Sequence, residues 1–314
     1  MSQTYDLIII GGGISGLSGS MYASRLGLKT LCLAEMPGGL ITTTHLVENW
    51  PGIINISGPD LAMALYNHAQ ANNVEIKNEK VLKLENLSTE KNSPSFKVTT
   101  TSNEYSSKTL LISTGTQHRK LNVPGMKEFE NKGVSYCALC DGAFFKNKIV
   151  CVVGGGDSAA KEALFLSEHA SKVYIFVRKD VLRAEPINAE RVKNNPKIEV
   201  VFLTSLESVS GDKKVAKVKI KSGEGKYSDQ ELPMDGVFMA IGHDAQTELA
   251  SQIGVELNDK KEIKINRHSE TNVLGVFAAG DCCDTEFKQA ITGSSEAVTA
   301  AYYAFHVCKN GAGF

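Results

Sequence analysis

The sequence lacks the features that mark membrane proteins and nucleic-acid-binding proteins. In its 314 residues no apolar run approaches the roughly 20 residues of a membrane-spanning helix. Neither sign of charge is in excess, because 34 basic residues stand against 35 acidic ones. This balance gives no reason to expect nucleic acid or an anionic membrane as a partner. The first residues also lack the basic region of a signal peptide, and we expect a cytoplasmic protein.

The cysteines do not form the even set of a secreted disulfide scaffold, because there are seven of them. Cys32 and Cys151 fall in apolar runs and are interpreted as inert core residues. Cys282 and Cys283 are adjacent. Vicinal cysteines rarely form a disulfide, so we expect ordinary packing for this pair.

Cys137 and Cys140 form the one pair with redox spacing. Two thiols separated by two residues can close a disulfide within one helical turn, and that ring can store and release two electrons. A zinc site is an alternative, but it needs about four ligands, and the sequence has no second C-x-x-C and no nearby His-Cys group. A purely structural disulfide is the other alternative, and such bonds are rare in a cytoplasmic chain.

A first glycine-rich loop, Gly11-Gly12-Gly13-Ile14-Ser15-Gly16, follows an apolar run. A helix to about residue 26 and a strand at 30–34 complete a βαβ unit that ends at Glu35. The glycines let a pyrophosphate approach backbone N–H groups at the helix N-terminus. Glu35 stands where a carboxylate accepts hydrogen bonds from the hydroxyls of an adenosine ribose. It would repel a 2′-phosphate, so we expect FAD or NAD(H) here; a solvated loop residue is the alternative.

The same plan recurs from residue 149 onward. The loop 154–159 reads G-G-G-D-S-A, and the same number of residues separates Gly154 from Arg178 as separates Gly11 from Glu35. Arg178 is followed by Lys179 and, one turn later, by Arg183. Three cations where the first unit has an acid favour a 2′-phosphate, so we infer NADPH at the second loop. An exposed basic face is the alternative.

Each unit continues into a polar, alternating stretch that favours a small β-meander, and then into a buried strand that ends at a glycine. A further loop of the first type, residues 276–281, follows the second of these strands, so the second unit is inserted into the first. We therefore predict an α/β fold with two Rossmann-like dinucleotide-binding domains. The predicted ranges are 1–115 with 246–314 for the outer domain, 116–245 for the inserted domain, and 116–122 and 243–247 for the hinges.

Asp281 follows an apolar strand and Gly280, which suits hydrogen bonding to the ribityl chain of a flavin. Capping the N-terminus of a helix is a second reading of this residue, and both can hold. A helix that begins near residues 288–290 would direct its N-terminus at the flavin ring.

Together these motifs resemble the low-molecular-weight thioredoxin reductases of bacteria and archaea, which are FAD- and NADPH-dependent pyridine nucleotide-disulfide oxidoreductases. The resemblance runs nearly end to end. The segments that carry it are 38–44 (GGLITTT), 47–52 (VENWPG), 137–142 (CALCDG), 177–180 (VRKD), 183–185 (RAE), 240–243 (AIGH), 277–281 (FAAGD) and 288–292 (KQAIT).

The resemblance implies a homodimer that binds FAD in the outer domain and NADPH in the inserted domain, which carries the redox-active cysteines. Carried over by position, the residues implied to contact FAD are Gly11, Gly13, Gly16, Glu35, Gly39, Leu40, Asn49, Val81, Thr114, Gly115, Gly280, Asp281, Lys288, Gln289 and Ala290. The residues implied to contact NADPH are Gly156, Ser158, Ala159, Arg178, Lys179, Arg183 and Ile241.

The chain departs from the family's usual residues at three places. Leu40 stands where the family has Gln, so one hydrogen bond beside the flavin is absent. Val177-Arg178-Lys179 stands where the family has His-Arg-Arg, and Lys cannot make the bidentate contact of Arg with a phosphate. Lys288 stands where the family has Arg.

The resemblance implies a thioredoxin-disulfide reductase, which passes electrons from NADPH through FAD and the Cys137–Cys140 disulfide to thioredoxin. By the family pattern Cys140 faces the flavin, and Cys137 attacks the disulfide of thioredoxin. Asp141 is the expected acid that protonates the leaving thiolate, since an anion beside a thiol disfavours the thiolate. Nicotinamide and disulfide need the same flavin ring, so we expect the inserted domain to rotate between half-reactions.

Other functions compete with this one. A dithiol oxidase of the same fold and a reductase supplied by ferredoxin would both work without NADPH, and the cationic cluster at 178–183 argues against both. A non-catalytic flavin-binding sensor would not need the two cysteines and Asp141. His243 is either a proton relay or a packed hinge residue.

Overall fold

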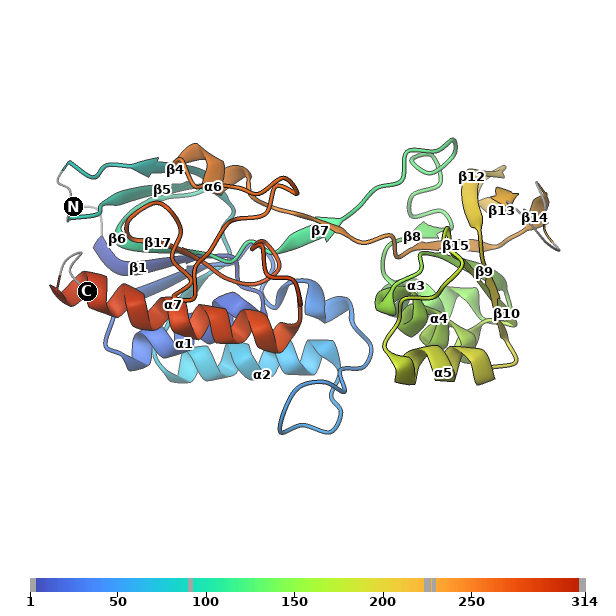
Figure 1. The fold of residues 1–314 in the computed structure, drawn as a ribbon, viewed down its shortest axis with the longest axis horizontal. Helices are drawn as coiled ribbons and strands as arrows, with labels where there is room; N and C mark the ends of the chain where they lie inside the picture. The colour runs from blue at the N-terminus through green and yellow to red at the C-terminus, as the bar shows by residue number, and fades with distance from the viewer. Residues whose placement is uncertain (1–3, 90–92, 223–226, 228–229, 311–314) are drawn as a thin grey trace. The chain divides into compact units, whose positions relative to one another are not determined.

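The computed structural model describes residues 4–89, 93–222, 227 and 230–310. The chain divides into two compact units, shown in Figure 1. The first unit comprises residues 1–117 and 245–314, and the second comprises residues 118–244. The chain therefore passes between the units twice, and each crossing lies inside a connection that was expected to act as a hinge.

The first unit is built on a seven-stranded sheet. Its strands lie in the order β3-β2-β1-β6-β5-β4, and β17 also pairs with β6. The pairs among β1, β2, β3, β6 and β17 are parallel, whereas β4, β5 and β6 form the expected antiparallel meander. The strands are β1 Thr4–Ile10, β2 Thr30–Leu33, β3 Glu75–Lys77, β4 Val81–Asn86, β5 Phe96–Thr100, β6 Glu104–Ile112 and β17 Val276–Ala278.

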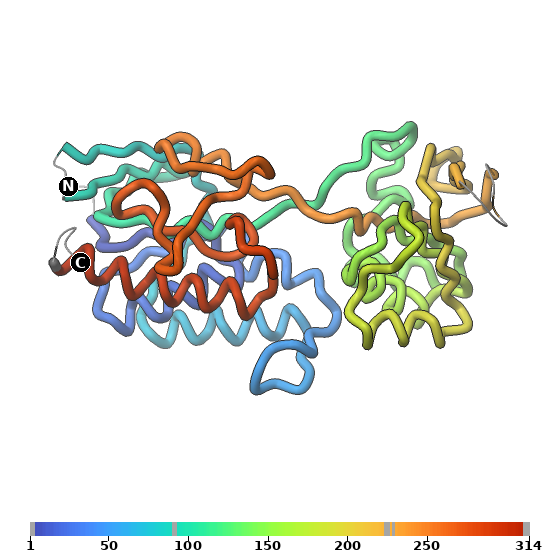
Figure 2. Tube along the Cα trace, viewed as in Figure 1, coloured from blue at the N-terminus to red at the C-terminus, as the bar shows by residue number. Residues whose placement is uncertain are grey.

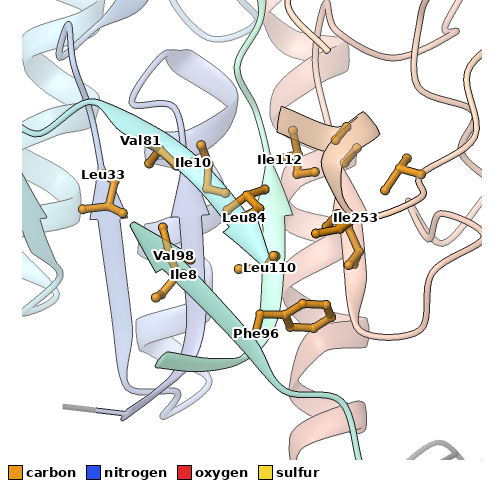
Figure 3. Packing of buried hydrophobic residues seen from close by; sticks show 14 of the residues in the cluster. Ile8, Ile10, Leu33, Val81, Leu84, Phe96, Val98, Leu110, Ile112 and Ile253 are labelled. Atoms are coloured by element: carbon orange, nitrogen blue, oxygen red, sulfur yellow. The ribbon is translucent and has the colours of Figure 1, made fainter. Parts of the chain in front are cut away.

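Both faces of this sheet are buried, which explains why successive residues of β1 are apolar. Ile8 and Ile10 face one core, which also contains Phe96 and Leu110; Figure 3 shows Ile10 near Val81 and Ile8 near Val98. Leu7 and Ile9 face a second core, which α1, α2 and α7 cover (Figure 1). The helices of this unit are α1 Ile14–Arg25, η1 Gly39–Thr43, α2 Gly58–Ala71, α6 Glu248–Gln252 and α7 Ala290–Asn310.

The second unit repeats the plan on a smaller scale. A parallel sheet runs in the order β11-β10-β9-β15-β8, and the expected meander is a separate antiparallel sheet, β12-β13-β14. The predicted α/β class is thus confirmed. The elements are β8 Val134–Ser135, α3 Ala138–Asp141, η2 Gly142–Phe145, β9 Ile149–Val153, α4 Asp157–His169, β10 Lys172–Phe176, α5 Pro186–Asn194, β11 Ile198–Val201, β12 Thr204–Gly211, β13 Val215–Ser222, β14 Glu231–Pro233 and β15 Gly236–Met239.

The two connections between the units pair with each other. Strand β7 (Thr116–His118) lies beside strand β16 (His243–Ala245), and Figure 2 lets the reader follow both passages of the chain. The rings of His118 and His243 contact each other, with centroids 4.7 Å apart. Partial desolvation lowers the pKa of both imidazoles. His243 itself is exposed, so neither of its two readings is tested by this contact.

Candidate active site

The redox pair lies at the start of a short helix in the second unit. Cys137 and Cys140 are joined by a disulfide. Cys137 is the residue that caps α3, and its Sγ accepts a hydrogen bond of 3.1 Å from the backbone N–H of Cys140. Cys140 is exposed and Cys137 is half-buried. The predicted disulfide is therefore formed, and a reaction partner can reach its sulfurs from solvent.

Asp141 is linked to the disulfide through a serine that the sequence did not single out. Ser135 Oγ donates a hydrogen bond of 2.6 Å to the Asp141 carboxylate. The same oxygen accepts one of 3.0 Å from the backbone N–H of Cys137. Ser135 is buried, so water does not replace these bonds readily. The carboxylate of Asp141 is thereby fixed within the turn that carries both cysteines, where an acid must lie to serve them.

Some glycines at the first glycine-rich loop are closely surrounded by backbone atoms, whereas others have open space around them. A Cβ on Gly11 would lie 2.2 Å from the carbonyl oxygen of Ser113. A Cβ on Gly16 would lie 1.9 Å from the carbonyl oxygen of Gly11. At Gly13 and Gly115, by contrast, a Cβ would meet no atom closer than 3.9 Å. Helix α1 begins at Ile14, inside this loop, so the free N–H groups of its first turn can donate hydrogen bonds to an anion.

Glu35 lies just beyond the carboxyl end of β2, whereas Val81 lies at the amino end of β4, a strand that is not next to β2 in the sheet order. Glu35 follows β2, and its exposed carboxylate contacts the Lys80 ammonium at 3.0 Å. Val81 opens β4 and is 9% exposed. A dinucleotide bound at the loop has its adenosine at the carboxyl end of β2. The placement suits the predicted contact of Glu35 with a ribose.

The segment from Asp281 to Ala290 brings several predicted residues together. Gln289 Oε1 accepts a hydrogen bond of 2.9 Å from Asn49 Nδ2. Burial raises the pKa of the Asp281 carboxyl, and the nearby Lys288 ammonium lowers it by less. A raised pKa and shielding from solvent suit a group that bonds to ligand hydroxyls. Helix α7 begins at Ala290, as expected for a helix starting near residues 288–290.

The ammonium of Lys288 lies among oxygens of the protein itself. Its Nζ lies 2.6 Å from Glu262 Oε1 and donates hydrogen bonds of 2.8 Å to the carbonyl oxygens of Asp281 and Cys283. These three oxygens match the three donors of an ammonium group. The side chain is thus committed to the protein's own oxygens in this structure.

The second glycine-rich loop has the same construction. A Cβ on Gly154 would lie 2.1 Å from the carbonyl oxygen of Ala240, whereas Gly156 has open space around it. The N–H of Arg183 donates a hydrogen bond of 2.7 Å to the carbonyl oxygen of Gly155. Asp157 Oδ1 accepts hydrogen bonds from the N–H of Glu185 at 2.9 Å and from Asn188 at 2.8 Å. These bonds hold the cationic segment beside the N-terminus of α4, where Ser158 and Ala159 lie.

The three predicted cations of this unit are exposed. Arg178 and Lys179 follow β10, and Arg183 lies beside the loop. Within the described ranges, none of the three forms an ion pair with a carboxylate. Exposed cations without acidic partners beside an open glycine loop form a site for a phosphate group. Ile241, the remaining predicted contact, lies at the edge of the hydrophobic core of this unit.

The other cysteines follow the expectations from sequence. Cys32, Cys151, Cys282 and Cys283 are buried free thiols. Cys282 and Cys283 belong to the same hydrophobic core as Ile8 and Ile10, with their Sγ atoms 4.0 Å apart. Burial raises the pKa of the Cys32 thiol to about 12, so this thiol is inert at neutral pH. Ordinary packing of the vicinal pair is confirmed.

The sequence did not point to the residues that hydrogen-bond to the predicted contact residues and lie far from them in the chain. Glu296 of α7 accepts a hydrogen bond of 2.8 Å from the N–H of Gly280. The side-chain amide of Gln246 donates one of 3.0 Å to the carbonyl oxygen of Thr114. A single Glu or Gln in a sequence carries no motif, so only its position in the fold identifies such a role.

The residues of each unit fit the nucleotide expected there. The first unit combines an open glycine loop, the exposed carboxylate of Glu35 after β2 and the partly buried carboxyl of Asp281, which suits FAD. The second unit combines an open glycine loop with three exposed cations, which suits the 2′-phosphate of NADPH. Among the described residues no cluster of three or more potential metal ligands occurs, and no helix is long and apolar enough to cross a membrane.

Comparison with known proteins gives consistent matches along the chain. Residues 5–300 match the family model of pyridine nucleotide-disulphide oxidoreductases. A thioredoxin reductase of Treponema pallidum is 39% identical over 309 residues, which cover 97% of each chain. A crystal structure of Lactococcus lactis thioredoxin reductase has a TM-score of 0.91 and 36% identity, and the match covers 97% of this chain and 99% of that one.

A further solved structure is similar over the same length. It is a ferredoxin-flavin thioredoxin reductase from Clostridium acetobutylicum, with a TM-score of 0.51 and 30% identity. The match covers 96% of this chain and 97% of that one. The overall likeness thus includes relatives with different electron donors, and the donor must be argued from the second glycine loop.

Proposed function

Because the chain belongs to the pyridine nucleotide-disulphide oxidoreductases, and among them to the thioredoxin reductases, we propose that it reduces thioredoxin with electrons from NADPH. FAD and the Cys137–Cys140 disulfide carry these electrons between donor and acceptor. The observation that carries the proposal is the coexistence, in one unit, of this reachable disulfide and a glycine loop flanked by free cations.

The chemistry of the protein's own cysteines begins once the disulfide has been reduced. Cys137, as a thiolate, attacks one sulfur of the thioredoxin disulfide, so that a mixed disulfide forms and a thioredoxin thiolate leaves. Asp141 protonates the leaving sulfur. Cys140 then attacks Cys137, which restores the Cys137–Cys140 disulfide and releases the second thioredoxin sulfur. Overall, NADPH and one proton reduce one disulfide to two thiols, and NADP⁺ is formed.

The two nucleotides have distinct sites in this proposal. The outer unit holds FAD with its glycine loop, Glu35, Asp281 and the segment that leads into α7. FAD, when bound, supplies the two-electron chemistry that links a nicotinamide to a disulfide. The inserted unit holds NADPH with its own loop and with Arg178, Lys179 and Arg183. The fit of each loop to its nucleotide supports this assignment.

The proposal includes a rotation of the inserted unit between half-reactions. A disulfide placed against a flavin cannot at the same time reach a protein substrate, and the nicotinamide needs the same ring. Only two passages of the chain join the units, which limits the backbone that must change. The paired strands β7 and β16 are where we expect the change in dihedral angles.

The competing electron donors are less well supported. An oxidase that uses O2 or a reductase supplied by ferredoxin would have no need of a phosphate-binding cluster. Arg178, Lys179 and Arg183 are exposed around an open loop. This arrangement favours NADPH over the alternatives, even though a relative named for ferredoxin is similar in fold.

Flavin absorbance tests the proposal directly. The purified protein with FAD is mixed anaerobically with NADPH or NADH, and oxidised thioredoxin is then added. We expect NADPH to bleach the flavin and thioredoxin to restore its colour. The Cys140→Ser variant should still bleach with NADPH yet fail to reduce thioredoxin. Absence of bleaching with either nucleotide would contradict NADPH as donor and favour the oxidase or the ferredoxin reading.

Likeness to the family also supports a homodimer in the cytoplasm. The buried free thiols of Cys32 and Cys151 are compatible with a reducing compartment. Sedimentation equilibrium of the protein with FAD measures the oligomeric state, and a monomer at micromolar concentration would contradict the dimer.

A further inference from the structure

The segment between β17 and α7 carries the predicted flavin contacts but has no helix or strand of its own. It extends from Ala279 to Gln289 and contains Asp281. Backbone outside regular structure needs other partners to keep one conformation. The side chains that bond to this backbone therefore decide how accurately the Asp281 carboxyl is placed.

The strongest of these partners is the ammonium of Lys288. It binds the carbonyl oxygens of Asp281 and Cys283, at 2.8 Å each, and so joins the beginning of the segment to its end. Its third donor goes to Glu262 Oε1 at 2.6 Å. The bonds are charge-assisted and therefore stronger than bonds between neutral groups.

Glu262 is itself held in place by hydrogen bonds that do not involve the lysine. Its Oε2 accepts a hydrogen bond of 2.7 Å from Asn258 Nδ2, and its N–H donates one of 2.9 Å to Asn258 Oδ1. Burial raises the pKa of the Glu262 carboxyl, but hydrogen bonds from Lys288 and Asn258 outweigh this effect and leave the pKa below its ordinary value. The side chains of Glu262 and Lys288 are 15% and 27% exposed. Solvent therefore screens the pair less than an exposed one.

The stretch of chain that carries Glu262, which is not part of a regular strand, also contacts the segment. The N–H of Ile263 donates to the carbonyl oxygen of Cys282, and the N–H of Asp284 donates to the carbonyl oxygen of Ile263, both at 2.9 Å. The ion pair thus continues a backbone contact between residues 262–263 and 282–284. On this geometry, and resting on the proposed FAD site, we propose that Glu262 and Lys288 are a positioning pair. They hold the Asp281 segment in the conformation that binds the ribityl chain of FAD, and Lys288 acts through Asp281 rather than on the cofactor.

A direct contact of Lys288 with FAD predicts the opposite change in FAD affinity when the charge of Glu262 is removed. If Lys288 reached the anionic cofactor itself, removing the charge of Glu262 would free the ammonium and tighten FAD binding. If the pair positions the segment, Glu262→Gln weakens FAD binding just as Lys288→Met does. Removing a group that orients a ligand-binding residue typically costs about 10- to 100-fold in affinity, so we expect at least about tenfold here.

The experiment titrates FAD into apoprotein and follows the quenching of flavin fluorescence. The variants are Glu262→Gln, Lys288→Met, the double variant and Lys264→Met as matched control. Lys264 forms an exposed ion pair with Glu256, 3.6 Å long, on the same stretch of chain. We expect both single variants to lose about tenfold or more, the double variant to lose no more than the larger single loss, and Lys264→Met to bind like the wild type.

Three results would overturn the positioning pair. They are tighter FAD binding in Glu262→Gln, unchanged affinity in both single variants, and an equal loss in Lys264→Met. In each of these results the wild type still binds FAD, so the proposed function stands. A wild-type protein that binds no FAD would instead overturn the proposed function, and the positioning pair with it. Lys288→Arg adds a check, because it keeps the charge and should recover part of the lost affinity.

Discussion

Replacing Glu162 with Gln should remove a pH dependence from the stability of the second unit. Glu162 lies on α4, and its Oε2 is shielded from solvent without a hydrogen-bond partner among the described residues. Burial raises the pKa of this carboxyl from 4.5 to about 8. The neutral acid is therefore the form that the folded protein holds at neutral pH.

The magnitude follows from linkage between protonation and folding. In the unfolded chain Glu162 ionises near pH 4.5, whereas in the folded chain it stays protonated up to about pH 8. The stability that goes with the protonated form is complete below pH 4.5 and is lost as the pH rises towards 8. Between these two pKa values the free energy of unfolding falls by about 1.4 kcal/mol per pH unit. The loss is therefore on the order of 3 kcal/mol at pH 7 and reaches on the order of 5 kcal/mol once the folded protein is fully ionised at this residue. Gln cannot ionise, so it should not show this loss.

Amide hydrogen exchange of β9 and β10 measures the stability of this unit separately from the other. We expect the free energy of opening in Glu162→Gln to rise relative to wild type by several kcal/mol between pH 5 and pH 8. At pH 5 the variant should equal the wild type or fall slightly below it, because its amide is also buried without a partner. The control is Glu168→Gln, an exposed position on the same helix. Equal pH dependence in wild type and Glu162→Gln would refute the reasoning.

Three other substitutions test separate parts of the active site. Arg178→Ala should lower kcat/KM for NADPH about 10- to 100-fold, the worth of one charge-assisted contact, and leave the value for NADH unchanged; an equal loss with both nucleotides would contradict a 2′-phosphate contact. Ser135→Ala should slow thioredoxin reduction by about tenfold without changing flavin bleaching by NADPH, because it releases Asp141 and the N–H of Cys137. Phe144, 80% exposed and four residues after Cys140, should support docking of thioredoxin, so Phe144→Ala should raise KM for thioredoxin but not for a small aromatic disulfide.

The elements that could be predicted from sequence are those in which local chemistry dictates the residue. A Cβ on Gly11 or Gly154 would clash with a backbone carbonyl oxygen about 2 Å away, so glycine is required wherever this loop occurs. The C-x-x-C spacing likewise places two sulfurs within bonding distance on one turn. Such signals are complete within a few residues, and the loops, the disulfide and the α/β class followed from them.

The supporting residues depend on contacts that no local pattern records. Glu262 meets Lys288 across 26 positions of the chain, and Glu296 meets Gly280 only after α7 has folded back on the loop. Lys288 shows the consequence most clearly. Its position in the sequence predicted a contact with FAD, which stays a prediction, but gave no sign of the three protein oxygens around its ammonium. A motif gives a residue's place in the chain, whereas the partners of a long side chain are set by the fold.

The pairing of β7 with β16 has a consequence for how the two units could be separated. Because these strands lie side by side, the inserted unit leaves and re-enters its host at almost one point. Among the residues of 118–244 that the structure describes, none contributes a strand to the host sheet or a side chain to its two large cores. In topological terms the second unit is a single insertion between residues 117 and 245 of the first. Joining residue 115 to residue 246 through a short glycine linker should leave a self-contained flavodomain, which could serve as an acceptor for other redox modules.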